Sequence, residues 1–215
     1  MLCFVTEDAD FGRRIAAALT ARGIFLFRCT PDNAAFLCEE KDCGGVILDA
    51  RGEGEAMRSL CDYLRKTYPP MPIALLTSPS APVSGQVDCI LRQTDLDSQL
   101  EALYEFCVRV CGFRTQCLST PALYITSNPD ECLYMGTPFP LSPREHTVLR
   151  CLFYRYPRVT SADDLMSLCY HDADCSIGNL AVQIHAINQR AERLKLLPLV
   201  VNVYRKGYCL REGIL

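Results

Sequence analysis

The sequence lacks any hydrophobic segment long enough to cross a membrane. Its apolar runs, such as residues 46–48 and 196–201, are far shorter than the ~20 residues that a transmembrane helix needs. Met1 is followed directly by Leu2-Cys3-Phe4-Val5, without a basic segment or a cleavage site, so a secretory signal peptide is not expected. We therefore expect a cytoplasmic protein that makes no contact with membranes.

The sequence also lacks the local signatures of common enzymes. It contains no nucleophile–base motif, no glycine-rich phosphate-binding loop and no metal-hydrolase motif, so we expect that it is not an enzyme. A strong positive charge is missing as well. Residues 1–119 hold 12 Lys and Arg against 16 Asp and Glu, and residues 120–215 hold 10 against 9, which gives the formal net charge of −3. Composition by itself therefore gives no indication of nucleic-acid binding.

The 14 cysteines do not form a recognisable zinc or redox motif, because no two of them have the C-x-x-C spacing. The closest groups are Cys38 with Cys43, Cys107 with Cys111 and Cys117, and Cys169 with His171 and Cys175. Structural zinc sites usually show two closely spaced ligand pairs. The pattern favours free thiols that pack as small apolar side chains, with a thiol- or metal-responsive site as the alternative.

The first half of the sequence alternates short apolar runs with helical patterns. The runs cover residues 2–5, 24–27, 46–48, 72–77 and 87–91. Between them, apolar residues recur every three or four positions, as Phe11, Ile15 and Leu19 do, which places them on one face of a helix. Strands that alternate with helices indicate an α/β domain with a parallel sheet.

The pattern changes near residues 112–120. Short strand-like pieces at residues 123–125, 132–134 and 139–141 precede Ser142-Pro143-Arg144-Glu145, which is typical of a helix N-terminus. Two further helices are expected near residues 161–168 and 177–194, and residues 199–210 predict a hairpin. Three helices followed by a hairpin predict an α+β winged helix-turn-helix domain.

Several segments resemble, in order and spacing, the DNA-binding domain of OmpR/PhoB-type response regulators. They are Leu141-Ser142-Pro143-Arg144-Glu145, Arg158-Val159-Thr160-Ser161, Asn179-Leu180-Ala181-Val182-Gln183-Ile184 and Tyr204-Arg205-Lys206-Gly207-Tyr208. The first half resembles the receiver domain of the same family, which has a flavodoxin-like fold. The resemblance implies a receiver-like domain at residues 1–111, a linker at 112–120 and a winged-helix domain at 121–215.

The resemblance also implies a function and a phosphorylation site. A regulator of this type is a transcription factor of a two-component system that binds double-stranded DNA, and its further partners are a sensor histidine kinase and RNA polymerase. Asp49 falls on the phosphoacceptor position, Thr77 on the hydroxyl residue that contacts the phosphoryl group, and Glu7 on one of the acids that hold magnesium. Mg²⁺ held by Glu7, Asp8 and Asp49 would be needed only if the receiver is phosphorylated, and no other cofactor is expected.

Departures from the family's pattern weaken the case for phosphorylation. Thr6 stands where a second acid is expected, although Asp8 could partly replace it, and Gln93 stands where the family has a lysine. Glutamine cannot supply the positive charge that holds a phosphoryl group. Thr94 stands where a proline normally follows, and residues 78–86, which contain two prolines, leave little room for a fourth helix. We therefore expect a degenerate fourth helix.

These departures predict a regulator that is largely independent of phosphorylation and acts as a homodimer through its receiver domain. In that role the receiver would serve as a dimerisation module, using the helix expected at residues 96–107 and the run at 87–91. Two alternatives stay open. The first is a conventional response regulator phosphorylated on Asp49, and the second is a thiol- or metal-responsive regulator.

The helix expected near residues 177–194 has two distinct faces. One is apolar and would pack on the core through residues such as Leu180, Ile184 and Leu194. The other is expected to enter the major groove, where Asn179 and Gln183 can pair with adenine and Val182 can contact a thymine methyl. The expected DNA-contacting residues are Asn179, Val182, Gln183, Ala186, Arg190, Arg193, Tyr204, Arg205 and Lys206. The arginines and the lysine of this set are expected to contact phosphates.

Overall fold

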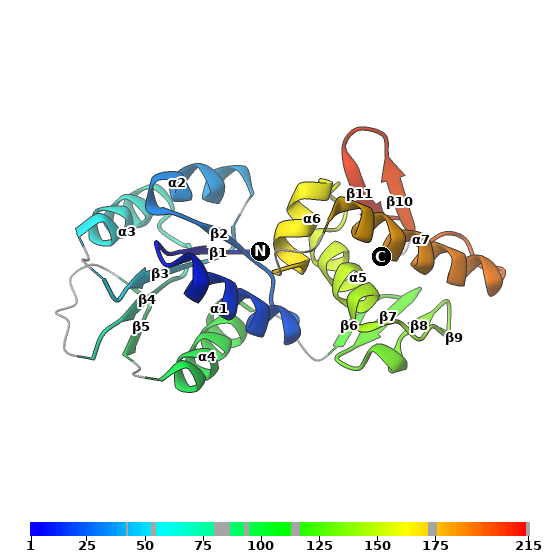
Figure 1. Cartoon of the computed structure of the whole chain (residues 1–215), viewed down its shortest axis with the longest axis horizontal. Coiled ribbons are helices and arrows are strands. Elements are labelled where there is room, and N and C mark those ends of the chain that lie inside the picture. Colours follow the sequence, from blue (N-terminus) through cyan, green and yellow to red (C-terminus); the bar gives the residue numbers. More distant parts are fainter. Residues whose placement is uncertain are drawn as a thin grey trace. The chain divides into compact units, whose positions relative to one another are not determined.

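The structure is a computed structural model that describes residues 1–41, 43–52, 55–79, 87–92, 95–112, 117–171 and 176–213. The chain forms two compact units, each with its own strands and helices (Figure 1). The first comprises Met1–Leu19 and Ile24–Phe113, and the second comprises Arg114–Leu215 with the short segment Thr20–Gly23. Within the described residues, no helix has the length and apolar character needed to span a bilayer.

The first unit is built around a five-stranded parallel sheet with the strand order β2-β1-β3-β4-β5. The strands are β1 (Leu2–Val5), β2 (Leu26–Cys29), β3 (Val46–Ala50), β4 (Ile73–Thr77) and β5 (Cys89–Arg92). The helices are α1 (Ala9–Ala21), α2 (Pro31–Glu40), α3 (Glu55–Thr67) and α4 (Leu96–Glu105), which continues as a π-helical segment, η1 (Phe106–Val110). This strand order is the flavodoxin-like one, so the predicted α/β receiver-like fold is confirmed.

Helices cover both faces of this sheet, which explains why its strands are apolar at successive positions. Leu2 and Phe4 of β1 pack with residues of α1 and α4 on one face, and Cys3 and Val5 pack with residues of α2 and α3 on the other. All four residues of β1 are therefore fully buried. The strand order reverses between β1 and β3, so their carboxyl ends meet at the crevice where folds of this kind bind ligands.

The second unit begins with a four-stranded antiparallel sheet and continues with three helices and a hairpin. The sheet strands are β6 (Cys117–Ser119), β7 (Leu123–Thr126), β8 (Leu133–Tyr134) and β9 (Thr137–Pro138), with a short 3-10 helix, η2 (Pro129–Glu131), after β7. The helices are α5 (Pro143–Arg155), α6 (Ala162–Cys169) and α7 (Ile177–Arg193), and the hairpin consists of β10 (Val200–Val203) and β11 (Gly207–Leu210). The predicted winged helix is confirmed, with the hairpin as its wing (Figure 1).

Two local signals fix parts of this winged helix. Ser142 caps α5, because its hydroxyl accepts a bond from the Glu145 backbone N–H while the Glu145 carboxylate accepts one from the Ser142 N–H at 2.7 Å. Gly207 begins β11 with a φ of +126°, and a Cβ there would lie 2.1 Å from the Thr160 carbonyl oxygen. Only glycine fits this close approach, which is held by paired hydrogen bonds of 2.8 Å between Thr160 and Tyr208.

Two expectations from the sequence need correction, and a third is only partly described. Strand β6 lies within the expected linker at residues 112–120, so this stretch is not simply a connection. Leu194, which was expected on the buried face of the third helix, is the C-cap of α7 and is 37% exposed. Ser78 and Pro79 are not helical, and the rest of the segment expected to hold a degenerate fourth helix, residues 80–86, lies outside the described residues.

Candidate functional site

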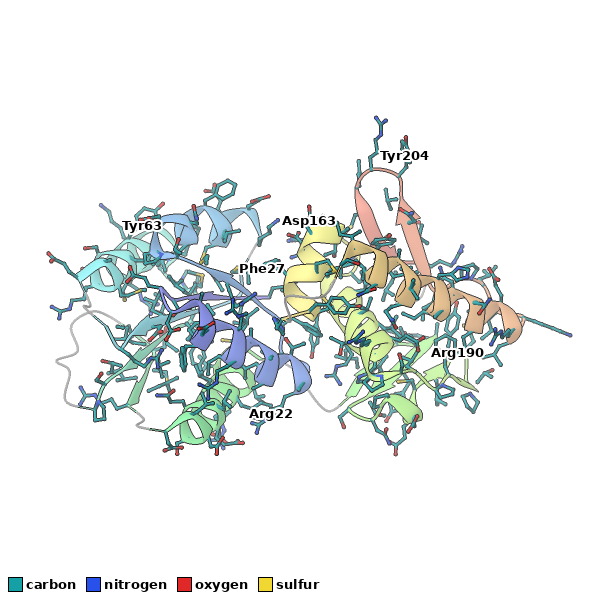
Figure 2. All side chains as sticks on the ribbon, viewed as in Figure 1. Arg22, Phe27, Tyr63, Asp163, Arg190 and Tyr204 are labelled. Carbon is teal, nitrogen blue, oxygen red and sulfur yellow. The ribbon has the colours of Figure 1, made fainter. Side chains whose placement is uncertain are left out.

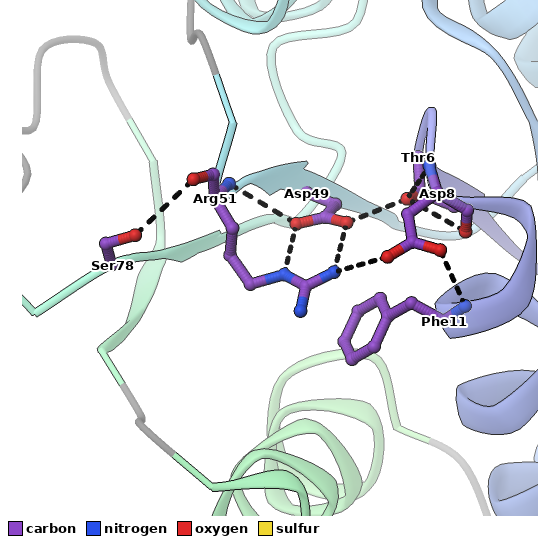
Figure 3. Close-up of polar contacts among 6 residues, drawn as sticks. All are labelled: Thr6, Asp8, Phe11, Asp49, Arg51 and Ser78. Atoms are coloured by element: carbon purple, nitrogen blue, oxygen red, sulfur yellow. Dashed lines mark hydrogen bonds and ion pairs between the residues drawn. The ribbon is translucent and has the colours of Figure 1, made fainter.

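The expected phosphoacceptor lies in the crevice at the carboxyl ends of β1 and β3 (Figure 3). Asp49 is the fourth residue of β3, and Thr6 follows β1 directly. Both side chains are buried, and so is Thr77, the last residue of β4, which pairs with Ala50 of β3. The topology therefore places the expected acid and the expected hydroxyl residue on neighbouring strands at one edge of the sheet.

Both carboxylate oxygens of Asp49 accept hydrogen bonds (Figure 3). Oδ2 accepts from Thr6 Oγ1 at 2.7 Å and from Arg51 Nη2 at 2.9 Å. Oδ1 accepts from Arg51 Nε at 2.8 Å and from the Arg51 backbone N–H at 3.3 Å. The guanidinium thus binds the carboxylate through two parallel charge-assisted bonds. A buried carboxylate needs such a partner because removing its charge from water is costly.

Arg51 is held in this position by contacts on several sides. Its Nη2 lies 3.7 Å from Asp8 Oδ2, and its guanidinium carbon lies 3.3 Å from the centre of the Phe11 ring. Stacking on an aromatic face suits the planar, weakly hydrated guanidinium. The Arg51 carbonyl accepts a bond from Ser78 Oγ at 3.4 Å. Sequence analysis did not identify Arg51; the only signal was a basic residue two positions after the acid that ends a buried strand.

The other residues predicted for this pocket have different roles or positions. Asp8 precedes α1 and caps it, because its Oδ1 accepts a bond from the Phe11 backbone N–H at 2.9 Å, while its Oδ2 lies 3.7 Å from Arg51 Nη2. Glu7 is exposed to solvent, and Gln93 and Thr94 lie outside the described residues. The crevice therefore brings Asp49 and Asp8 together around a guanidinium.

In the structure the Asp49 carboxylate is already paired with a cation, the Arg51 guanidinium, and the expected magnesium ion stays a prediction. Within the described part of the chain, no group of three or more His, Cys, Asp and Glu side chains could hold a metal ion. Mg²⁺ requires oxygen ligands in octahedral geometry at about 2.1 Å. Here the two oxygens of Asp49 already bind Arg51, so the cation beside the carboxylate is supplied by the protein.

Helix α7 presents the two faces that the sequence predicted. Leu180, Ile184, Ile187 and Ala191 are buried. On the other face, Val182 is 63% exposed, Asn179, Gln183 and Ala186 are partly exposed, and Arg193 is exposed with its guanidinium donating to Gln189 Oε1 at 2.9 Å. The predicted groove-facing residues thus follow one another at helical spacing on an accessible side of α7.

Arg190 of α7 (labelled in Figure 2) was predicted to contact phosphate. In the structure it forms an ion pair with a buried carboxylate. Its Nη1 donates to Glu145 Oε2 at 2.8 Å, and the Glu145 side chain is only 5% exposed. The guanidinium also lies 5.8 Å from the centre of the Phe139 ring. Because Glu145 belongs to the capping box of α5, Arg190 connects α7 to the start of that helix.

Asn188 is a positioning residue that sequence analysis missed. Its Nδ2 donates to the Val200 carbonyl at 2.7 Å, and its Oδ1 accepts from the Val200 N–H at 2.9 Å. The side-chain amide of Asn188 thus hydrogen-bonds both backbone groups of Val200 in β10, in the way that a residue of an adjacent β-strand does. This pair of bonds fixes the wing to α7, on which the residues predicted to face the groove lie.

The turn at the tip of the wing consists of the three predicted residues Tyr204, Arg205 and Lys206. Tyr204 is labelled there in Figure 2. Tyr204 is 80% exposed, and the guanidinium of Arg205 lies 5.1 Å from the centre of its ring. Arg205 adopts the left-handed region with a φ of +59°, and the Lys206 N–H closes the turn on the Val203 carbonyl at 2.9 Å. Two cations and an aromatic ring are thus displayed together on a tight turn.

Comparisons with known proteins give similarity to solved structures only, since no family model and no curated protein matches. The response regulator DrrB, a Thermotoga maritima OmpR/PhoB homologue, is 16% identical with a TM-score of 0.39 over 97% of both chains. A structure from a family of streptococcal redox sensors that evolved from two-component response regulators is 12% identical, with a TM-score of 0.43 over 99% of both chains.

A third similar structure is the DNA-binding domain of the response regulator AdeR in complex with an intercistronic region. It is 16% identical with a TM-score of 0.38 and matches 43% of this chain and 96% of that domain. At similarities this low, the fold assignment rests on the strand order of the first unit and on the helices and hairpin of the second.

Proposed function

We propose that the protein is a sequence-specific transcription regulator that binds double-stranded DNA through α7 and the wing. One observation best supports this function: α7 has an accessible face, and Asn188 fixes this helix to the wing. The tip of the wing carries two exposed cations. A helix of this kind enters the major groove, where the amides of Asn179 and Gln183 can pair with adenine. Val182 offers a methyl contact for thymine, and Ala186 leaves room for close approach.

The phosphate contacts of this proposal come from the wing and from the end of α7. Arg193, Arg205 and Lys206 are exposed, and Tyr204 can add a hydroxyl contact. Such contacts position a protein on the duplex without reading its sequence. Arg190 makes a smaller contribution to DNA binding than these residues, because its guanidinium neutralises buried Glu145.

We further propose that the receiver-like unit acts without phosphorylation of Asp49. Transfer of a phosphoryl group to a carboxylate requires an oxygen that is free to attack, together with a cation that neutralises the incoming oxygens. The bidentate pair with Arg51 occupies both oxygens of Asp49. Phosphorylation would change the charge of this crevice, whereas in the structure Arg51 already balances the charge of Asp49. A sensor histidine kinase is therefore not a required partner.

In this proposal the receiver-like unit serves as a dimerisation module. The helix α4 with η1 and the adjoining strand β5 form the surface that we assign to this role. Ile90 of β5 and Val110 of η1 are 44% and 46% exposed, which leaves apolar surface on neighbouring elements. Two protomers on adjacent half-sites would gain affinity through effective concentration, and the assembled regulator would act on RNA polymerase.

A DNA titration of the full chain tests the proposed function. We expect the unphosphorylated protein to bind genomic duplex fragments at low salt, with log K falling linearly as log[salt] rises. Arg205→Ala should reduce both the affinity and the salt dependence. Arg13→Ala, which removes an exposed charge from the first unit, serves as the matched control and should change neither. A folded protein that binds no DNA at low salt would overturn the proposal.

A further inference from the structure

An open cavity of about 510 Å³ lies in the first unit, at the end of the sheet opposite to Asp49. Its walls come from the end of α2, the segment that leads into β3, and the segment between α3 and β4. Tyr68 and Met71 line it together with two thiols, those of Cys38 and Cys43. Cys38 is buried and Cys43 is partly exposed, so the cavity offers small molecules a route toward these two residues.

The two thiols lie close together because of the way in which α2 ends. The Cys43 N–H donates to the Cys38 carbonyl at 3.2 Å, which folds the chain back onto the last turn of the helix. Helix ends with this hydrogen bond commonly bring the two side chains into contact. Cys3 of β1 interacts with both thiols, and its Sγ lies 3.2 Å from Cys29 Sγ. Four thiols thus gather beside one solvent-accessible wall.

Contacts between these thiols and their burial change their pKa values. Interaction with Cys3 lowers the pKa of Cys38, but contact with Cys43 and burial outweigh it and raise the pKa to about 12. The pKa of Cys3 is also raised, above all by its contact with Cys29. The Cys38 thiol is therefore protonated near neutral pH. Since the thiolate is the attacking species, oxidation of this cluster should become faster as the pH rises.

We propose that Cys38 and Cys43 form a dithiol site that is oxidised reversibly by low-molecular-weight disulfides of the glutathione type. One thiol loses its proton and its sulfur attacks the small disulfide, which breaks the S–S bond and releases one small thiol. The second protein thiol then attacks this mixed disulfide and releases the other small thiol. Two protein thiols are oxidised to one disulfide, and one small disulfide is reduced to two thiols, so electrons and protons balance.

Two other pairs of neighbouring thiols serve as internal controls. Cys151 interacts with Cys169, and Cys107 interacts with Cys111, and burial is the largest cause that raises the pKa of Cys169 and of Cys107. Neither pair lines the cavity. If access through the cavity determines reactivity, Cys38 and Cys43 should be oxidised while these pairs stay reduced. If proximity alone were sufficient, all three pairs would react alike.

The test uses the reduced full chain in glutathione redox buffers at pH 8.5, followed by alkylation, digestion with trypsin and mass spectrometry. Cleavage after Arg28, Lys41 and Arg51 places Cys38 in residues 29–41 and Cys43 in residues 42–51. The expected product is a dithiothreitol-sensitive cross-link between these peptides, with fragment ions that place it on Cys38. It should survive in Cys29→Ser, disappear in Cys38→Ser, and form while the two control pairs are still alkylated. A cross-link to Cys3 or Cys29, glutathione retained on Cys43 alone, or equal oxidation of the control pairs would each overturn the proposal.

Discussion

Each unit contains an arginine–carboxylate pair with a buried acid. The two pairs are similarly exposed, but the partners are close in sequence in the first unit and far apart in the second. In the first, the Asp49 side chain is 6% exposed and that of Arg51 is 29% exposed; in the second, the values are 5% for Glu145 and 31% for Arg190. Each pair has an N–O distance of 2.8 Å. Asp49 and Arg51 are two residues apart, whereas Glu145 and Arg190 are 45 apart. The same chemistry therefore fills a pocket in one unit and connects two helices in the other.

The largest expected effect comes from breaking the long-range pair. Arg190→Ala leaves Glu145 buried without its cation and should lower the free energy of unfolding by about 3–5 kcal/mol. Urea denaturation of the full chain measures this loss when it is monitored through the unfolding transition of the second unit. Arg193→Ala removes an exposed charge three residues away and should change the stability by less than about 0.5 kcal/mol. Equal effects of the two substitutions would show that the pair with Glu145 does not stabilise the fold.

The local pair should show a smaller effect on stability. Arg51→Ala leaves Asp49 with the Thr6 hydroxyl but without its cation, and we expect a loss of about 1–3 kcal/mol. Adding Asp49→Ala should recover part of that loss, because the acid no longer needs a partner. A double-mutant cycle measures the coupling, which should be about 0.5–3 kcal/mol. Additive effects would mean that Arg51 does not interact with Asp49 in solution.

Two variants should affect DNA binding in different ways, because one residue is proposed to contact bases and the other to contact phosphates. Gln183→Ala should cost about 1–3 kcal/mol on the preferred site and relax the preference at one base position. Arg205→Ala should weaken binding to all sequences alike and reduce the salt slope by about 1. Titrations on the preferred site and on unrelated duplexes distinguish the two results. If neither variant changes affinity, the wrong face of α7 has been assigned to the groove.

The smallest expected effect concerns a buried histidine of the second unit. His146 of α5 is buried with its Nε2 2.8 Å from the Thr126 carbonyl oxygen, and burial lowers its pKa. The unfolded chain therefore binds a proton at this residue at higher pH than the folded chain does. Stability should fall as the pH drops below about 6.5, by at most about 1.4 kcal/mol per pH unit. Denaturation of wild type and His146→Gln across pH 5–8 checks this, and an unchanged pH dependence in the variant would contradict it.

Much of the fold could be predicted because local patterns determine it. Apolar runs without alternation indicate strands covered on both faces, as in β1, and Ser142 with Glu145 predicts the start of α5 correctly. Strand β6 was missed because a three-residue strand carries too little pattern to be told from a linker. Its pairing with β7 depends on the partner strand rather than on its own residues.

The site was harder to predict than the fold. Asp49 was identified because the resemblance to receiver domains marks an acid near the carboxyl end of the third strand. Arg51 was missed because the direction of its side chain depends on the conformation of the segment after β3 and on Phe11, which lies far away in sequence. For Arg190, a helical projection gives the angle of the side chain around α7, but it cannot show that Glu145 lies in reach.

The central claim is that DNA binding does not require phosphorylation of Asp49. The most direct test titrates specific DNA with wild type and Asp49→Asn, with and without beryllofluoride and Mg²⁺, and follows association by sedimentation. We predict that the untreated wild type already self-associates and binds its site, and that beryllofluoride changes neither property. A wild type that stays monomeric and binds weakly until beryllofluoride is added, beside an unresponsive Asp49→Asn, would contradict the claim.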